Sequence, residues 1–151
     1  MPDTRPGIRF VDGVCVACIH YEKSKNKDWV KRMNEFRQLC DKHRNSNGNS
    51  YDCAIAVSGG KDSHFQVHYM KNIMKMNPLL LSVGNIDWTE TGRKNLENIS
   101  EVFGCDIIML QPNRKIAKKM FKKAFEKLGS PSWYLDYQMY SFPVRMCIKL
   151  G

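Results

Sequence analysis

The feature that most constrains the fold of this chain is the run SGGKDS at residues 58–63, which directly follows the apolar stretch CAIAV at 53–57. The apolar stretch predicts a short buried strand, and a helical pattern begins at Asp62. Glycines let successive backbone N–H groups turn toward one point, and the N-terminus of the next helix adds unpaired donors. Because Lys61 adds a positive charge and Ser58 and Ser63 add hydroxyl groups, the run predicts a polyphosphate site.

This run is not a Walker A loop, because that motif requires a glycine at the position that Ile55 occupies. SGGKDS instead resembles the PP-loop of the N-type ATP pyrophosphatases. These enzymes split ATP between its α and β phosphates and pass AMP to a carbonyl or amide oxygen. The plain alternative is a tight strand-to-helix turn, in which Asp62 only complements the helix dipole.

Short apolar segments alternate with helical patterns through the rest of the chain. We expect strands at 52–57, 79–83 and 106–110, and helices at 62–76, 91–103 and 113–128, with Gly104 as a helix C-cap. This order predicts an α/β fold, with a parallel, doubly wound, Rossmann-like sheet and its ligand at the carboxyl ends of the strands. Three strands make half of such a sheet, and residues 132–151 show no clear fourth one. We therefore expect an incomplete sheet that belongs to a longer enzyme.

The first fifty residues differ in character from this alternating region. Residues 1–26 are expected to be irregular, residues 28–43 fit an amphipathic helix, and the polar run at 45–50 reads as a linker. The predicted organisation is an N-terminal accessory segment at 1–50 with a cysteine pair, followed by an ATP-binding domain at 51–151.

The chain carries 24 Lys and Arg against 15 Asp and Glu, a net charge of +9, which favours anionic partners. Much of the excess lies in 114–127, where the spacing predicts an amphipathic helix with a solvated basic face; an RNA-contacting face is the alternative. No apolar run approaches the roughly 20 residues of a membrane span, and residues 1–10 lack a signal-peptide core. We expect a cytoplasmic protein without a membrane partner, whose six cysteines are reduced thiols or metal ligands.

Cys15 and Cys18 have the spacing of half a zinc site. Cys40 with His43, or His20, could supply other ligands, although Cys40 fits the apolar face of its helix and is better explained as a core residue.

Other polar and thiol groups have two interpretations each. His64 and His68 lie one helical turn apart and form either a metal pair or two solvated positions. Asp87, Glu90 and Thr91 follow the second strand, where one could hold Mg²⁺ or a ribose, while Thr91 could simply cap a helix. Three further cysteines are treated as buried thiols, with a sulfur-transfer relay left open: Cys53, Cys105 and Cys147.

Four segments together resemble the N-acetyl sugar amidotransferases of bacterial surface-polysaccharide and flagellin-sugar biosynthesis. They are PDTRPGIRFVDGVCVACIHYE at 2–22, YDCAIAVSGGKDS at 51–63, TGRKNLENI at 91–99 and GCDIIMLQPN at 104–113. The resemblance implies a PP-loop domain of the adenine nucleotide alpha hydrolase type. It also implies adenylation of the N-acetyl carbonyl of a sugar nucleotide by ATP and Mg²⁺, followed by displacement of AMP by ammonia from a glutaminase subunit.

The resemblance also assigns residues. Ser58, Gly59, Gly60, Lys61, Asp62 and Ser63 would bind the pyrophosphate part of ATP, with Lys61 stabilising its developing charge. Val83, Gly84 and Asn85 would face the adenine and ribose, and no general base is assigned. Family members carry a second cysteine pair upstream and continue well beyond residue 151, so a four-cysteine Zn²⁺ site and the sugar site look incomplete here. A tRNA-modifying PP-loop enzyme (thiolation or lysidine formation) and an inactive ATP-binding module are the alternatives.

Overall fold

The computed structural model describes residues 9–45, 51–85 and 87–150. Internal contacts divide the chain into two compact units, Met1–Gln38 and Leu39–Gly151. The predicted linker lies mostly at residues 46–50, outside the described residues, as do residues 2–8 of the first segment with family resemblance. The division into an accessory segment and an ATP-binding domain stays a prediction.

The N-terminal unit begins with a small hairpin. Strands β1 (Phe10–Val11) and β2 (Val14–Cys15) pair antiparallel around Asp12 and Gly13, which both have positive φ, 50° and 76°. Helix α1 (Val16–Lys25) follows directly, and α2 spans Trp29–His43. The expectation of irregular structure is therefore wrong for residues 10–25. The overlooked signal is Asp-Gly between apolar residues, a dipeptide that favours a two-residue hairpin turn.

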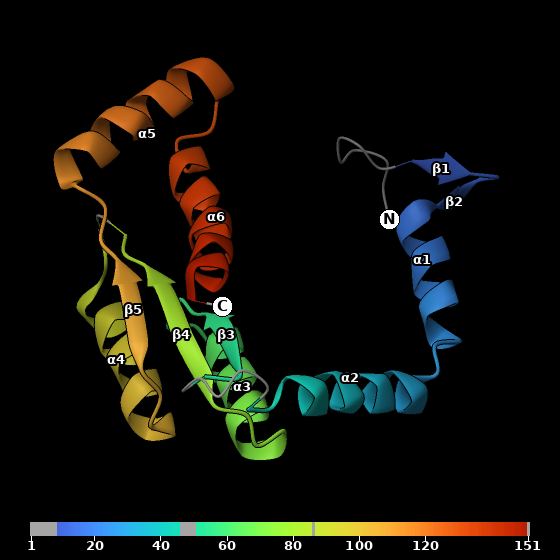
Figure 1. Cartoon of the computed structure of the whole chain (residues 1–151). Coiled ribbons are helices and arrows are strands. Elements are labelled where there is room, and N and C mark those ends of the chain that lie inside the picture. The colour runs from blue at the N-terminus through green and yellow to red at the C-terminus, as the bar shows by residue number, and fades with distance from the viewer. Residues whose placement is uncertain (1–8, 46–50, 86, 151) are drawn as a thin grey trace. The chain divides into compact units, whose positions relative to one another are not determined.

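The second unit contains a parallel three-stranded sheet in the order β3-β4-β5 (Figure 1). The strands are β3 (Cys53–Ala56), β4 (Pro78–Val83) and β5 (Ile107–Leu110). In the register, Leu80 lies beside Ile55 on one side and Ile107 on the other. The α/β class and the incomplete doubly wound sheet expected from the sequence are confirmed.

Helices connect and follow the strands of the second unit. They are α3 (Lys61–His68), the π-helical turn η1 (Tyr69–Ile73), α4 (Glu90–Phe103), α5 (Arg114–Leu128) and α6 (Trp133–Leu150). The single helix expected at 62–76 is thus a shorter α-helix that widens into a π turn, in which the Met74 N–H donates to the Tyr69 carbonyl. Gly104 ends α4 in the left-handed conformation, as predicted.

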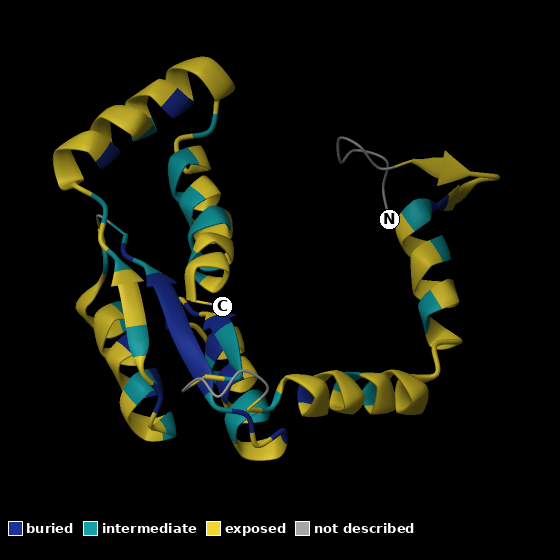
Figure 2. Ribbon diagram, in the orientation of Figure 1, coloured by how far each residue is buried: buried dark blue, intermediate teal, exposed yellow. Residues whose placement is uncertain are grey.

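The hydrophobic core lies on both faces of β4, which is the most deeply buried strand (Figure 2). On one face Leu80 packs with Ile55 and with residues of α3 and α4, among them Val67, Leu96 and Ile99. Leu79 and Leu81 point to the opposite face, where α6 packs against β3 and β4. Residues 133–150, for which no structure was predicted, therefore form the helix that covers the second face of the sheet.

Candidate nucleotide site

The SGGKDS run forms the turn between β3 and α3 and is held together by its own hydrogen bonds. The backbone N–H of Ser58 donates to the Ser63 hydroxyl at 3.0 Å, and the His64 N–H donates to the Gly60 carbonyl at 3.2 Å. Gly60 is the N-cap of α3, and because it has no side chain it makes no capping hydrogen bond. The first-turn N–H groups are therefore left for a ligand, which is the arrangement that an anion site requires.

Gly59 is the position of this turn that requires glycine. Its φ is +84°, and a Cβ atom there would lie 3.1 Å from the Gly92 carbonyl oxygen and 3.2 Å from the Leu96 nitrogen. The loop therefore packs closely against the first turns of α4. The cap of α4 is Thr89, whose hydroxyl accepts from the Gly92 N–H at 3.1 Å, so the interpretation of Thr91 as the cap is wrong.

The charged residues of the loop lie in the first turn of α3. Lys61 and Asp62 are exposed, whereas the Ser63 side chain is buried behind the loop. Because Lys61 is exposed beside uncapped backbone donors, it is free to move toward an anion. The assignment of these residues to ATP stays a prediction.

The three residues predicted to face adenine and ribose lie at the carboxyl end of β4. Val83 ends the strand, and the Gly84 N–H donates to the Leu110 carbonyl at 2.8 Å. A Cβ atom at Gly84 would overlap the side-chain amide of Gln111, so a larger residue would have to displace that amide. Asn85 lines a pocket of about 740 Å³ between the ends of β4 and β5 and helix α4.

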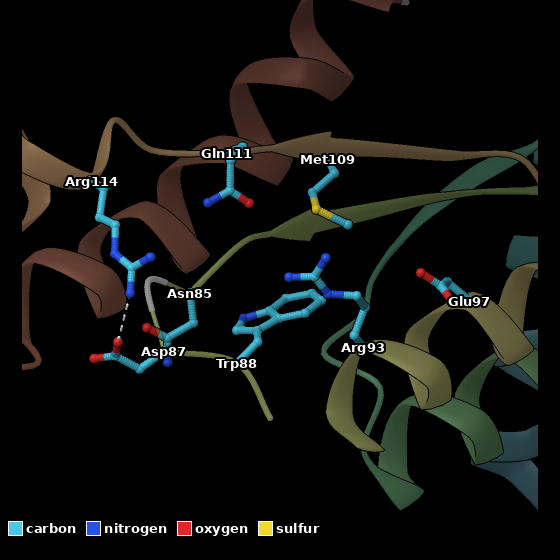
Figure 3. Close-up of a pocket in the computed structure, with 8 residues that line it drawn as sticks. All are labelled: Asn85, Asp87, Trp88, Arg93, Glu97, Met109, Gln111 and Arg114. Atoms are coloured by element: carbon cyan, nitrogen blue, oxygen red, sulfur yellow. Dashed lines mark hydrogen bonds and ion pairs between the residues drawn. The ribbon is translucent and has the colours of Figure 1, made fainter. Parts of the chain in front are cut away.

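This pocket, which we call the β4–β5 pocket, combines apolar and charged side chains (Figure 3). Figure 3 shows the Arg93 guanidinium beside the indole of Trp88. Arg114 pairs with Asp87 at 3.5 Å. The described residues that line it are Asn85, Asp87, Trp88, Arg93, Glu97, Met109, Gln111 and Arg114.

Sequence reasoning identified only part of this lining. Asn85 and Asp87 were predicted for the ligand end of the second strand, and the structure places both in the pocket. Arg93 and Glu97 were missed, although their i, i+4 spacing puts them on one face of α4. The exposed carboxylate of Glu90 instead pairs with Lys94 at 2.9 Å.

The Cys15–Cys18 pair is formed in the N-terminal unit. The two sulfur atoms lie 3.1 Å apart, and the Cys18 N–H donates to Cys15 Sγ at 3.4 Å. Their shared hydrogen bond lowers the pKa of Cys15 and raises that of Cys18. Within residues 9–45, 51–85 and 87–150, no cluster of three possible metal ligands occurs. The structure thus brings together two of the four ligands that a structural Zn²⁺ site needs, and His20 does not complete the site. Cys40 and His43 belong to the other unit, so their role as ligands stays a prediction.

The remaining candidate ligands and thiols either make local contacts within their helices or differ in burial. The ring of His64 contacts the Gly60 carbonyl at 3.0 Å, and His68 contacts the Asn72 amide at 3.1 Å. Cys40 is buried, as expected for a core residue, and Cys105 is buried too, whereas Cys53, also expected to be buried, is only half-buried. Cys147 was expected to be buried, but its side chain on α6 is exposed.

We expect Cys147 to react with iodoacetamide at least ten times faster than Cys53 at pH 8. Burial raises the pKa of Cys53 to about 11, so only about 0.1% of this thiol is the reactive thiolate at that pH. Timed alkylation followed by peptide mass spectrometry would measure both rates. Equal rates would contradict the described burial of Cys53 and reopen its use as a sulfur-transfer thiol.

The basic helix predicted at 114–127 is present as α5. Its apolar stripe is only partly covered, with Ala117 and Ala124 buried and Phe125 exposed. All the lysines of its basic run are exposed: Lys115, Lys118, Lys119, Lys122 and Lys123. Among the described residues, no helix is long and apolar enough to cross a membrane.

Comparisons with known proteins extend over only part of the chain. No protein-family model matches it. An uncharacterized protein of Methanocaldococcus jannaschii is 28% identical over 118 residues; the match covers 78% of this chain and 41% of that protein. The chain thus spans well under half the length of this relative.

A solved structure, that of a predicted subunit of tRNA methyltransferase from the same organism, is also similar in part. It is 26% identical, with a TM-score of 0.36, over 49% of this chain and 36% of its own. Neither match names a sugar amidotransferase, so that assignment rests on the sequence segments alone.

Proposed function

We propose that this chain carries the ATP site of an enzyme that activates an amide or carbonyl oxygen by adenylation. The observation that supports this most is the loop at 58–63, where uncapped N–H groups of α3 and the exposed Lys61 adjoin the carboxyl end of β3. Parallel α/β sheets bind their ligands at this edge.

In this proposal the loop binds the β and γ phosphates of ATP. The substrate oxygen attacks the α-phosphorus, the bond to the bridging oxygen breaks, and pyrophosphate leaves with the negative charge. Lys61 and the first-turn N–H groups stabilise that charge as it develops. Mg²⁺, when bound, neutralises part of the phosphate charge, and the exposed carboxylate of Asp62 is a suitable oxygen ligand for it.

For the acceptor, we propose the N-acetyl carbonyl of a sugar nucleotide, on the strength of the four resembling segments. An amide oxygen is a poor leaving group, whereas AMP is a good one. Ammonia, supplied by a glutaminase subunit, would add to the activated carbon and expel AMP, which leaves an acetamidino group. Cys15 and Cys18 would contribute to a Zn²⁺ site outside this chemistry.

A tRNA acceptor is the competing proposal. The observation that favours it is the row of exposed lysines on α5, since phosphate contacts by such residues dominate RNA affinity. Binding of this kind would weaken steeply as salt is raised.

The test is formation of AMP and pyrophosphate from ATP·Mg²⁺ with each acceptor. We expect AMP only when an N-acetylated sugar nucleotide and ammonium are both present. AMP formed with tRNA instead would support the competing proposal. Release of ADP and phosphate would contradict cleavage between the α and β phosphates, and ATP binding without any turnover would indicate a binding module.

A further inference from the structure

A second pocket lies on the α6 side of the sheet, in the same unit as the phosphate loop. This groove, which we call the α6 groove, has a volume of about 470 Å³ and runs between one face of α6 and the β5–α5 connection, Leu110 to Asn113. Because the sheet is parallel, the carboxyl end of β5 is at the same edge as the phosphate loop. Gln111 lines both this groove and the β4–β5 pocket, so the two cavities share a wall.

The charges in the α6 groove have one sign. Arg145 and Lys149, one turn apart on α6, are its ionisable cations, and none of the described residues lining it is a carboxylate. The β4–β5 pocket differs, because its two arginines are balanced by Asp87 and Glu97. The α6 groove is therefore the better site for a second anion.

The groove also contains an unused hydrogen-bonding group and fixed aromatic rings. Gln138 Oε1 is fully buried and makes no hydrogen bond within the part of the chain that the structure describes. Buried oxygens of this kind are normally satisfied. Because Gln138 also lines the groove, a rotation of its side chain would let Oε1 accept from a ligand O–H or N–H. Tyr134 is held edge-on to Phe121 at 6.3 Å, and Tyr137 stacks on Trp133 at 5.6 Å.

From these observations, and resting on the proposed function, we infer that the α6 groove binds the sugar-nucleotide acceptor. Arg145 and Lys149 bind its phosphates, and Gln138 Oε1 accepts a hydrogen bond from a hydroxyl or amide group of its sugar. The shared wall at Gln111 places this ligand next to the β4–β5 pocket. The loop and the β4–β5 pocket remain for ATP, which separates the two nucleotides.

The first test removes both cations of the groove, in the variant R145A/K149A. Calorimetric titrations use UDP-N-acetylglucosamine, UDP-N-acetylgalactosamine and CMP-N-acetylneuraminate as acceptor probes, and ATP·Mg²⁺ as reference. The control, K119A/K127A, removes the same charge from exposed positions on α5. We expect at least about tenfold weaker binding of a sugar-nucleotide probe in R145A/K149A alone, with ATP affinity unchanged in both variants.

Three results would overturn the inference: equal losses in both variants, no loss in either, or no binding of any acceptor probe to the unaltered chain. If ATP still binds and depends on Lys61, only the assignment of the groove fails. If ATP does not bind, the proposed function itself fails.

A second variant, Gln138→Leu, separates binding from folding. Leucine keeps most of the side-chain volume and removes the unsatisfied oxygen, so the melting temperature should stay the same or rise. We expect UDP-N-acetylglucosamine to bind at least about threefold more weakly, while UDP binds as before. Unchanged affinity for the sugar nucleotide would contradict the role of Gln138.

Discussion

Replacing Lys61 with alanine is expected to weaken ATP·Mg²⁺ binding by at least about tenfold, because a charge-assisted hydrogen bond contributes about 1.5–3 kcal/mol. The fold should not suffer. Lys61 is exposed in the first turn of α3, where a positive charge opposes the helix dipole, so its removal should leave stability unchanged or slightly higher. Calorimetric titration and thermal unfolding of the same preparation would measure both quantities.

The matched control for this variant is Lys94→Ala. Lys94 is exposed on the neighbouring helix α4, where it pairs with Glu90, so the substitution removes the same charge away from the loop. Its ATP affinity should equal that of the unaltered chain. An unchanged affinity in Lys61→Ala would reject the phosphate-loop assignment, and equal losses in both variants would indicate a general charge effect.

The central sheet could be predicted because turn residues flank its strands and because the strands are apolar enough to be buried. Residues 78–81 lie in the middle strand and are buried on both faces, which is why they form an uninterrupted apolar run. The strand begins at Pro78, and Asn77 and Gly84 flank it. Local sequence was enough here because burial and boundaries are both encoded within a few residues.

Helix α6 could not be assigned from local sequence. Pro143 lies inside it, and its aromatic residues do not recur at the spacing of an apolar helix face. Tyr140, for example, is 80% exposed. The helix forms because it covers Leu79 and Leu81 on the second face of the sheet, and this contact joins segments fifty or more residues apart. Tertiary packing here outweighs the low helix propensity of the segment.

The two parts of the candidate site also differ in how far local sequence predicts them. The phosphate loop is six consecutive residues, so the chemistry is visible in the sequence. The β4–β5 pocket draws Trp88, Arg93 and Arg114 from three segments, and only the strand order brings them together. Sequence also leaves open which position of the loop requires glycine, because the backbone angles of Gly59 and Gly60 cannot be read from the residue type.

Alanine should have very different effects on stability at these two glycines. In Gly59→Ala, a left-handed φ of +84° and contacts of 3.1 and 3.2 Å with the backbone of α4 should cost about 2–4 kcal/mol of unfolding free energy. In Gly60→Ala, φ is −80° and the nearest atom to the new Cβ is Ser58 Oγ at 3.6 Å. Stability should then change by less than about 1 kcal/mol, because the freedom lost by the unfolded chain is offset by the lower preference for alanine at the N-cap. Urea denaturation would measure both.

ATP titration of the folded Gly60→Ala variant then tests the backbone as a ligand. A methyl group at Gly60 stands beside the uncapped N–H groups of α3 and should hinder approach of a phosphate, so affinity should fall although the fold is intact. Gly60→Val, with a larger side chain, should reduce it further. A stable Gly59→Ala variant would contradict the described loop conformation. Undiminished ATP binding by both Gly60 variants would show that the phosphates do not contact this backbone, and the anion site would then have to be sought elsewhere on the sheet edge.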